Sequence, residues 1–162
     1  MKASAATIVL GAALIAAATA GPVSSGAARS QTPDGLTIVK QRQALMKRQN
    51  RDLRAIKNYL DGKGDPAKAQ AAAADVVQTT RRIPDLVPPN TGMAQYPGKS
   101  GAKPVIWSDY SGFLTAQRRA VAKADALSDA MKSGDKAASA AALEDLYKNG
   151  CDGCHKTYRE KL

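Results

Sequence analysis

The stretch SGDKAASAAALEDLYKNGCDGCHKTYREKL (residues 133–162) contains both cysteines and the single histidine of this 162-residue chain. Gly134 is a stop signal for the helix before it, and Asp135 is the N-cap of a last helix that runs past Leu143. This helix leads directly into the Cys/His cluster. We therefore expect any additional metal ligand that acts with the cluster to come from upstream.

Three upstream helices are predicted from apolar side chains at three- and four-residue spacing. The first runs from about Leu36 to Tyr59, and the second begins with Asp65 as N-cap and Pro66 at the first helical position. The third follows Pro104 and ends at Gly134. Residues 84–104 contain five prolines and three glycines, which predicts a long irregular crossover. Short first and last turns around this crossover predict an all-α fold, an antiparallel four-helix bundle.

The N-terminus has the pattern of a secretory signal peptide: a charged start at Lys2, an apolar run over 8–18 and small residues over 18–20. Cleavage after Ala28 is a second option. We expect a signal peptide over 1–20, an N-terminal extension over 21–35 and the bundle over 36–162. Because no later stretch is apolar enough to cross a bilayer, we expect a soluble exported protein without a membrane span.

The chain has a formal net charge of +10. A basic surface favours acidic protein partners and speeds encounter with them, although it is equally compatible with a plain solvated surface. Nucleic acid is a poor candidate partner, because one Phe and one Trp cannot form a base-stacking stripe.

Cys151, Cys154 and His155 form a C-x-x-C-H motif, the attachment signature of c-type haem. Two thiols three residues apart lie on one side of a helical turn, where both can add to the vinyl groups at one porphyrin edge. The adjacent histidine can then bind the iron as the proximal axial ligand. The motif predicts one covalently attached haem c.

Three other chemistries could use such a cluster. A Cys151–Cys154 disulfide suits an exported protein but leaves the neighbouring histidine unexplained. A thioredoxin-like pair needs a strand-to-helix turn, which the sequence does not predict. A zinc site needs a fourth ligand, and the chain has no further Cys or His.

The chain resembles the class II c-type cytochromes, the cytochrome c′ family. Four segments carry the resemblance: CDGCHKTYRE at the C-terminus, VKQRQALMK at 39–47, KPVIWSDYSGF at 103–113, and the Pro/Gly-rich crossover between the second and third helices. It implies the bundle fold, a periplasmic location and homodimers in some members. It also implies that Arg42 and Gln43 face the haem, with Arg42 on a propionate. Arg159 matches the family's proximal arginine.

In this family the residue four positions after the arginine faces the iron, and here that residue is Met46. The resemblance therefore implies the low-spin cytochrome c-556 type, with His155 and Met46 as iron ligands. Methionines on amphipathic helices are also common core residues, and Met93 in the crossover is a second candidate ligand. A one-residue shift of the alignment would place Leu45 there instead.

We therefore expect a periplasmic electron carrier that is not an enzyme and docks with redox partner proteins that have acidic surfaces. The alternative is a five-coordinate cytochrome c′ that binds nitric oxide or carbon monoxide at an open distal site. A purely structural bundle would require the haem motif to be accidental.

Overall fold

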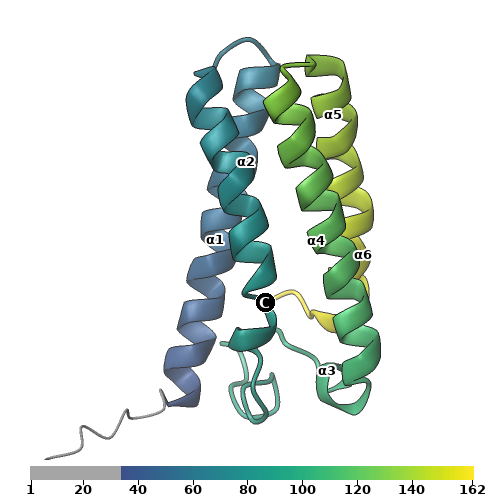
Figure 1. Ribbon diagram of the computed structural model, residues 1–162. Coiled ribbons are helices and arrows are strands. Elements are labelled where there is room, and N and C mark those ends of the chain that lie inside the picture. Colours follow the sequence, from purple (N-terminus) through teal and green to yellow (C-terminus); the bar gives the residue numbers. More distant parts are fainter. Residues whose placement is uncertain (1–33) are drawn as a thin grey trace, which may run out of the picture. The chain divides into compact units, whose positions relative to one another are not determined.

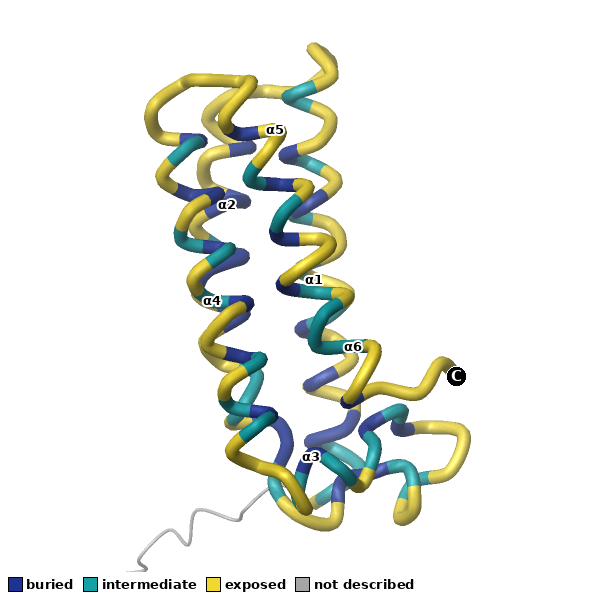
Figure 2. Tube along the Cα trace, turned by 90° about the vertical axis from the view of Figure 1, so that its right-hand side faces the viewer, coloured by how far each residue is buried: buried dark blue, intermediate teal, exposed yellow. Residues whose placement is uncertain are grey.

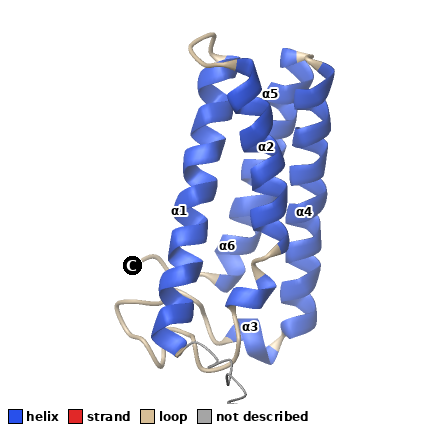
Figure 3. Cartoon of the chain, turned by 60° about the vertical axis from the view of Figure 1, so that its left-hand side comes forward, coloured by secondary structure: helices blue, strands red, loops and turns tan. Residues whose placement is uncertain are grey.

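The computed structural model describes residues 34–162, which form helices joined by turns and one long crossover (Figures 1 and 3). The predicted signal peptide, and all but the last two residues of the predicted extension, lie outside the described residues. In this part of the chain, no helix is both long and apolar enough to span a bilayer. The elements are α1 (Gly35–Leu60), α2 (Pro66–Arg81), η1 (Pro84–Leu86), α3 (Val105–Ser108), α4 (Tyr110–Ser133), α5 (Lys136–Asp145), η2 (Leu146–Cys151) and α6 (Asp152–Tyr158).

The long helices form two antiparallel hairpins, α1 with α2 and α4 with the continuous α5–η2–α6 rod (Figure 1). Helix α2 packs against both α1 and α4, and α4 packs against α5 and η2. The two short turns lie at one end of the bundle, and the crossover between η1 and α3 lies at the other (Figure 1). The predicted all-α four-helix bundle is confirmed.

An aspartate begins each of the four long helical segments. Its carboxylate accepts a hydrogen bond from a backbone N–H of the first turn, at 2.8–3.0 Å. These side chains satisfy N–H groups that have no partner within the helix and interact favourably with its positive end. The caps are Asp34, Asp65, Asp109 and Asp135.

The predicted third helix is interrupted near its start. Asp109 leaves the helical conformation (φ −129°, ψ 62°) and caps α4 by accepting a hydrogen bond from Gly112 N at 3.0 Å. A Cβ on Gly112 would collide with the Asp109 carboxylate, so the glycine makes room for this cap. The result is one separate turn, α3, before the long helix.

The last helix widens into a π-helical segment, η2, just before the Cys/His cluster. Buried Gly150 lies in this segment, where a Cβ would come within 2.8 Å of the Leu146 side chain. Such π segments change which residues face inward, and they are frequent at functional sites. Here the widened turn precedes the residues that carry the predicted haem chemistry.

Buried positions lie along the inward sides of the helices (Figure 2), and their side chains form two separate clusters. The first lies toward the two short turns and is built from small and branched side chains: Leu53, Ile56, Ala69, Ala72, Ala73, Val76, Val77, Ala124, Leu127, Met131, Leu143 and Leu146. The second lies at the crossover end and contains Val87, Ala102, Ile106, Phe113 and Tyr158. Helix periodicity accounts for the residues of the first cluster. The second cluster also contains residues from outside the helices, Val87 and Ala102.

Candidate functional site

A cavity of about 590 Å³ lies between the two clusters and is open to solvent on one side. Its walls come from α1, α2, the crossover, α4 and the η2–α6 segment. The side chains include Leu53, Val76 and Leu146 from the first cluster, and Val87, Ile106, Phe113 and Tyr158 from the second. This volume and largely apolar lining are typical of a site for a cofactor-sized group.

The Cys/His cluster forms one wall of this cavity. Cys151, Cys154 and His155 all line it, and no disulfide joins the two cysteines in this structure. Burial raises the pKa of Cys151 to about 11, with the charge of Asp152 adding to the shift, and burial also raises the pKa of Cys154. Burial disfavours the charged thiolate, which is the cause of both shifts.

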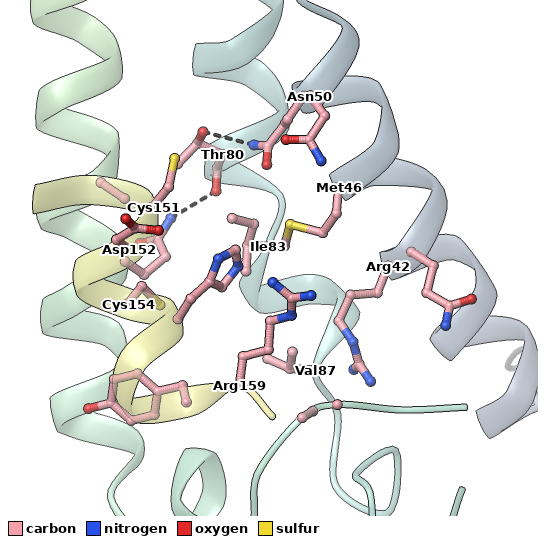
Figure 4. Close-up of a pocket in the computed structure, with 18 of the residues that line it drawn as sticks. Arg42, Met46, Asn50, Thr80, Ile83, Val87, Cys151, Asp152, Cys154 and Arg159 are labelled. Carbon is pink, nitrogen blue, oxygen red and sulfur yellow. Dashed lines mark hydrogen bonds between the residues drawn. The ribbon is translucent and has the colours of Figure 1, made fainter. Parts of the chain in front are cut away.

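His155 is prepared for metal binding by the same burial. Its pKa is lowered, first by desolvation and then by the positive charge of Arg159. A neutral imidazole is the form that binds iron, so the lowered pKa favours the ligating state at neutral pH. Arg159 lies one turn after His155, and its side chain lines the cavity (Figure 4).

Helix α1 supplies the opposite wall. Arg42, Gln43 and Met46 all line the cavity, and Met46 points from α1 into the space between α1 and the cysteine-bearing segment (Figure 4). Met46 is half-buried. Met93, the other candidate ligand, does not line the cavity.

Arg42 is a buried charge, only 9 % exposed, rather than a surface residue. Its Nη1 donates to Leu86 O (2.7 Å) and Thr91 Oγ1 (3.3 Å), and its Nη2 donates to Thr91 O and Ser100 Oγ (both 2.8 Å). No carboxylate among residues 34–162 pairs with it, and burial lowers its pKa. Four of the five N–H groups of a guanidinium are therefore committed to the crossover, which leaves Nε–H for a bound group.

Gln43 also contacts the crossover. Its Nε2 donates to Lys99 O at 2.7 Å, although its side chain is exposed. Arg42 and Gln43 thus attach α1 to both ends of the segment 86–100. Their predicted contacts with a haem remain predictions.

Several cavity residues could not be identified from the sequence. Val87 follows η1, and Ser100, Gly101 and Ala102 lie in the crossover. Helical periodicity does not extend to these positions, so no pattern marks which of them face inward. The one available signal is the density of Pro and Gly, which indicates irregular chain without giving its path.

The residues present fit a covalently attached haem. Two free thiols and a neutral imidazole lie on one cavity wall, and Arg42 places an uncompensated buried positive charge beside the same cavity. A buried charge without a partner is costly, so a negatively charged group of a bound cofactor would stabilise it. Among the described residues, no group of three or more His, Cys, Asp or Glu is placed to hold a metal ion.

Comparison with known proteins identifies the family. The Cytochrome C' family profile matches residues 37–159. A cytochrome c′ of Rubrivivax gelatinosus is 36 % identical over 98 residues (59 % of this chain, 74 % of the relative), and one of Rhodospirillum rubrum is 30 % identical over 135 residues (80 % and 86 %). This chain belongs to the cytochrome c′ family of class II c-type cytochromes.

Solved cytochromes c′ have the same fold. The crystal structure from Rubrivivax gelatinosus matches with a TM-score of 0.68 at 27 % identity, covering 80 % of this chain and all of that chain. A nitric oxide complex of a mutant from Alcaligenes xylosoxidans matches with a TM-score of 0.68 at 25 % identity, covering 78 % and 97 %. A third, described by its ligand-controlled dimer dissociation, has a TM-score of 0.72 at 23 % identity, covering 80 % and 99 %, and shows the shared fold.

These matches correct the main functional expectation. The prediction of a low-spin His155/Met46 electron carrier of the cytochrome c-556 type is wrong, because the family match and the relatives are cytochromes c′. The spacing from Arg42 to Met46 shows only that the two residues share a helix face. It cannot distinguish a methionine that binds iron from one that lines the cavity. The prediction of one covalently attached haem c is confirmed.

Proposed function

We propose that this member of the cytochrome c′ family binds nitric oxide or carbon monoxide at the open sixth coordination position of its haem c. The single observation that carries the proposal is the family match over residues 37–159 to proteins named cytochrome c′. A relative of the same fold has been solved as a nitric oxide complex. The cavity between α1 and α6 supplies the necessary space beside His155.

In this proposal Cys151 and Cys154 anchor the haem through thioether bonds, and His155 is its one protein axial ligand. The haem iron supplies the ligand-binding orbital for a diatomic gas. The protein holds the imidazole neutral by burial and by the charge of Arg159. The Nε–H of Arg42 is free to donate to a propionate, since the other donors hold the crossover.

Met46 limits access to the sixth position without binding the iron. Its half-buried side chain projects from α1 into the cavity (Figure 4). Val39, Leu53 and Val76 line the same cavity. Distal polarity and steric access decide which small molecules a haem binds. A flexible apolar side chain suits small, weakly polar gases such as nitric oxide and carbon monoxide. Binding and release need no substrate turnover, so we propose a carrier or sensor rather than an enzyme.

Carbon monoxide binding to the ferrous holoprotein tests this function. We expect the wild type to bind the gas and Met46→Ala to bind it about tenfold faster or more, a barrier change of about 1.4 kcal/mol. Met131→Leu is the matched control, because Met131 is a core methionine outside the cavity lining. If the wild type does not bind carbon monoxide until Met46 is removed, the proposal is wrong.

Exposed positive charges on the outer surface of α1 favour a partner protein with an acidic surface. Lys40, Lys47, Arg51 and Arg54 are exposed and form no ion pair within the described part of the chain. Lys47 also lines the cavity, so this basic stripe is continuous with the edge at which a haem would be reached. A positively charged surface beside the site increases encounter rates with negatively charged proteins, and this effect weakens as the salt concentration rises.

A homodimer is a further part of the proposal. The solved cytochrome c′ with a ligand-controlled dimer shares the fold, and family resemblance implies pairing through the first two helices. Symmetric pairing of α1 would bring its exposed cations together, so we expect dimerisation to strengthen with ionic strength. Sedimentation at low and high salt would show this; equal association at both would exclude α1 from the interface.

The proposed location is the periplasm, where cytochromes c′ generally occur. Export would depend on the predicted signal peptide over residues 1–20. This location is tested by expressing the chain with and without residues 1–20 and fractionating the cells. We expect protein with attached haem in the periplasmic fraction only when those residues are present.

A further inference from the structure

The crossover connects two cavity walls that face each other. On one side, Arg42 of α1 donates to Leu86 O, to Thr91 and to Ser100 Oγ. Met46 lies one helical turn further along the same helix. The crossover end of this contact is buried, because Thr91 and Ser100 are each only 2 % exposed.

On the other side, the crossover joins the chain directly after His155. Lys103 N donates to Tyr158 O (3.1 Å), Glu160 N donates to Gly101 O (2.7 Å), and Ala102 forms a β-bridge with Arg159. The Arg159 N–H in turn donates to His155 O at 3.1 Å. A Cβ on Gly101 would lie 2.3 Å from Glu160 O, so the two backbones meet at a distance that only glycine permits here.

Ser100 is the junction between these two contacts. Its hydroxyl accepts from Arg42 Nη2 (2.8 Å), donates to Thr91 O (2.9 Å) and accepts from Ala102 N (3.3 Å). All three partners are buried, and Ala102 is the residue bridged to Arg159. A buried, fully satisfied polar network of this kind fixes one geometry.

We propose that residues 86–103 form a strap that positions His155 relative to α1, with Arg42 and Ser100 as the positioning residues. The inference rests on the proposed gas-binding function. In it, the strap sets how firmly the imidazole is held while the opposite wall accommodates a gas molecule. Neither residue touches the iron or the gas molecule, and only Arg42, through its Nε–H, also faces a propionate in the proposed function. Both act through the hydrogen bonds that end at the turn carrying His155.

Two substitutions distinguish an effect of the strap's hydrogen bonds from an effect of the Arg42 charge. Arg42→Lys keeps the positive charge but cannot reach the four acceptor atoms with a planar fork. Ser100→Ala removes the junction hydroxyl and leaves the charge untouched. Ser139→Ala is the matched control, because Ser139 is 1 % exposed and its hydroxyl bonds to Asp135 O at 2.7 Å, away from the cavity.

The test measures the iron–histidine stretching frequency of the ferrous holoprotein and its carbon monoxide dissociation rate. We expect Arg42→Lys and Ser100→Ala each to shift the frequency and to change the rate about 2- to 30-fold, the range for residues that modulate a site at a distance. Ser139→Ala should change neither. The double variant should change the rate by less than the product of the two single effects, because both residues act in one network.

The strap proposal is wrong if both variants lower the melting temperature while frequency and rate stay at the wild-type values. That result would make Arg42 and Ser100 purely stabilising. Failure of the wild type to bind carbon monoxide would overturn the proposed function instead. In that case the reduction potential of the same variants decides the strap: a shift in both, absent in Ser139→Ala, supports it, and no shift overturns it.

Discussion

The two ends of the bundle are held together in different ways. At the end with the short turns, branched and small side chains such as Leu127 and Ala73 pack without exposure to solvent. At the crossover end, a buried arginine, two hydroxyls and backbone carbonyls hold irregular chain in place. The first arrangement needs only helix periodicity, whereas the second needs particular donors and acceptors. The cavity with the Cys/His cluster lies where the two meet.

The largest expected effect concerns the cavity end. Replacing both cysteines, Cys151→Ala with Cys154→Ala, removes the two thioether anchors. We expect the heated, denatured double variant to retain no haem on a gel stained for haem, while wild type does. Retention of haem by the double variant would contradict the attachment chemistry.

Leu127→Ala tests the packed end. Leu127 is fully buried in the first cluster, so the substitution should lower the free energy of unfolding by about 2–5 kcal/mol. Leu162→Ala is the control, because that leucine is 68 % exposed. Denaturant unfolding of the holoproteins measures the difference. We expect the haem absorption spectrum to stay unchanged, since Leu127 does not line the cavity; a changed spectrum would mean that the two ends are not separable.

Gly101→Ala tests the close contact between the crossover and residue 160. The new Cβ would lie 2.3 Å from Glu160 O, so the hydrogen bond from Glu160 N to Gly101 O must open. We expect a loss of about 1–3 kcal/mol in the free energy of unfolding, as for other overpacked sites. Gly153→Ala is the control, because its Cβ would meet only Lys148 O at an ordinary 3.7 Å. Equal effects of the two changes would refute a special role for this contact.

The smallest effect depends on pH and involves Asp52 on α1. Burial, together with its neighbour Asp75, raises the pKa of Asp52 to about 6, and its Oδ2 is buried without a hydrogen-bond partner. Folding therefore binds a proton at Asp52, so this carboxyl lowers stability as pH rises from about 4 through 6. Asp75 is paired with Arg48, which lowers its pKa.

We expect Asp52→Asn to stabilise the protein by about 1 kcal/mol at pH 7 and to have little effect at pH 4. Denaturant unfolding at the two pH values measures this. Lys57→Ala is a useful reference, because it removes an exposed pair with Asp61 on the same helix. A stabilisation that is the same at pH 4 and pH 7 would show that Asp52 does not titrate as described.

Sequence patterns predicted the packed end better than the cavity end. The starts at Asp65 and Asp135, the stop at Gly134 and the order of the helices follow from local propensity and are present in the structure. The C-x-x-C-H motif also located the proximal wall, because its chemistry requires a fixed spacing. These features depend on neighbours in the sequence.

The rest depends on contacts between distant residues. Nothing in the local sequence shows that Arg42 is buried against Thr91 and Ser100, which lie 49 and 58 residues away. The π segment before Cys151 also has no periodic signature. The same limit applies to the function of Met46. Its helical spacing from Arg42 predicted that both residues share a helix face, but it did not predict whether Met46 binds the iron.

The ferric absorption and electron paramagnetic resonance spectra of the holoprotein test the central claim most directly. With His155 as the one protein ligand and Met46 only lining the cavity, we predict a high-spin iron signal. A low-spin signal, accompanied by a sulfur-to-iron charge-transfer band, would show that Met46 binds the iron and would contradict the open site.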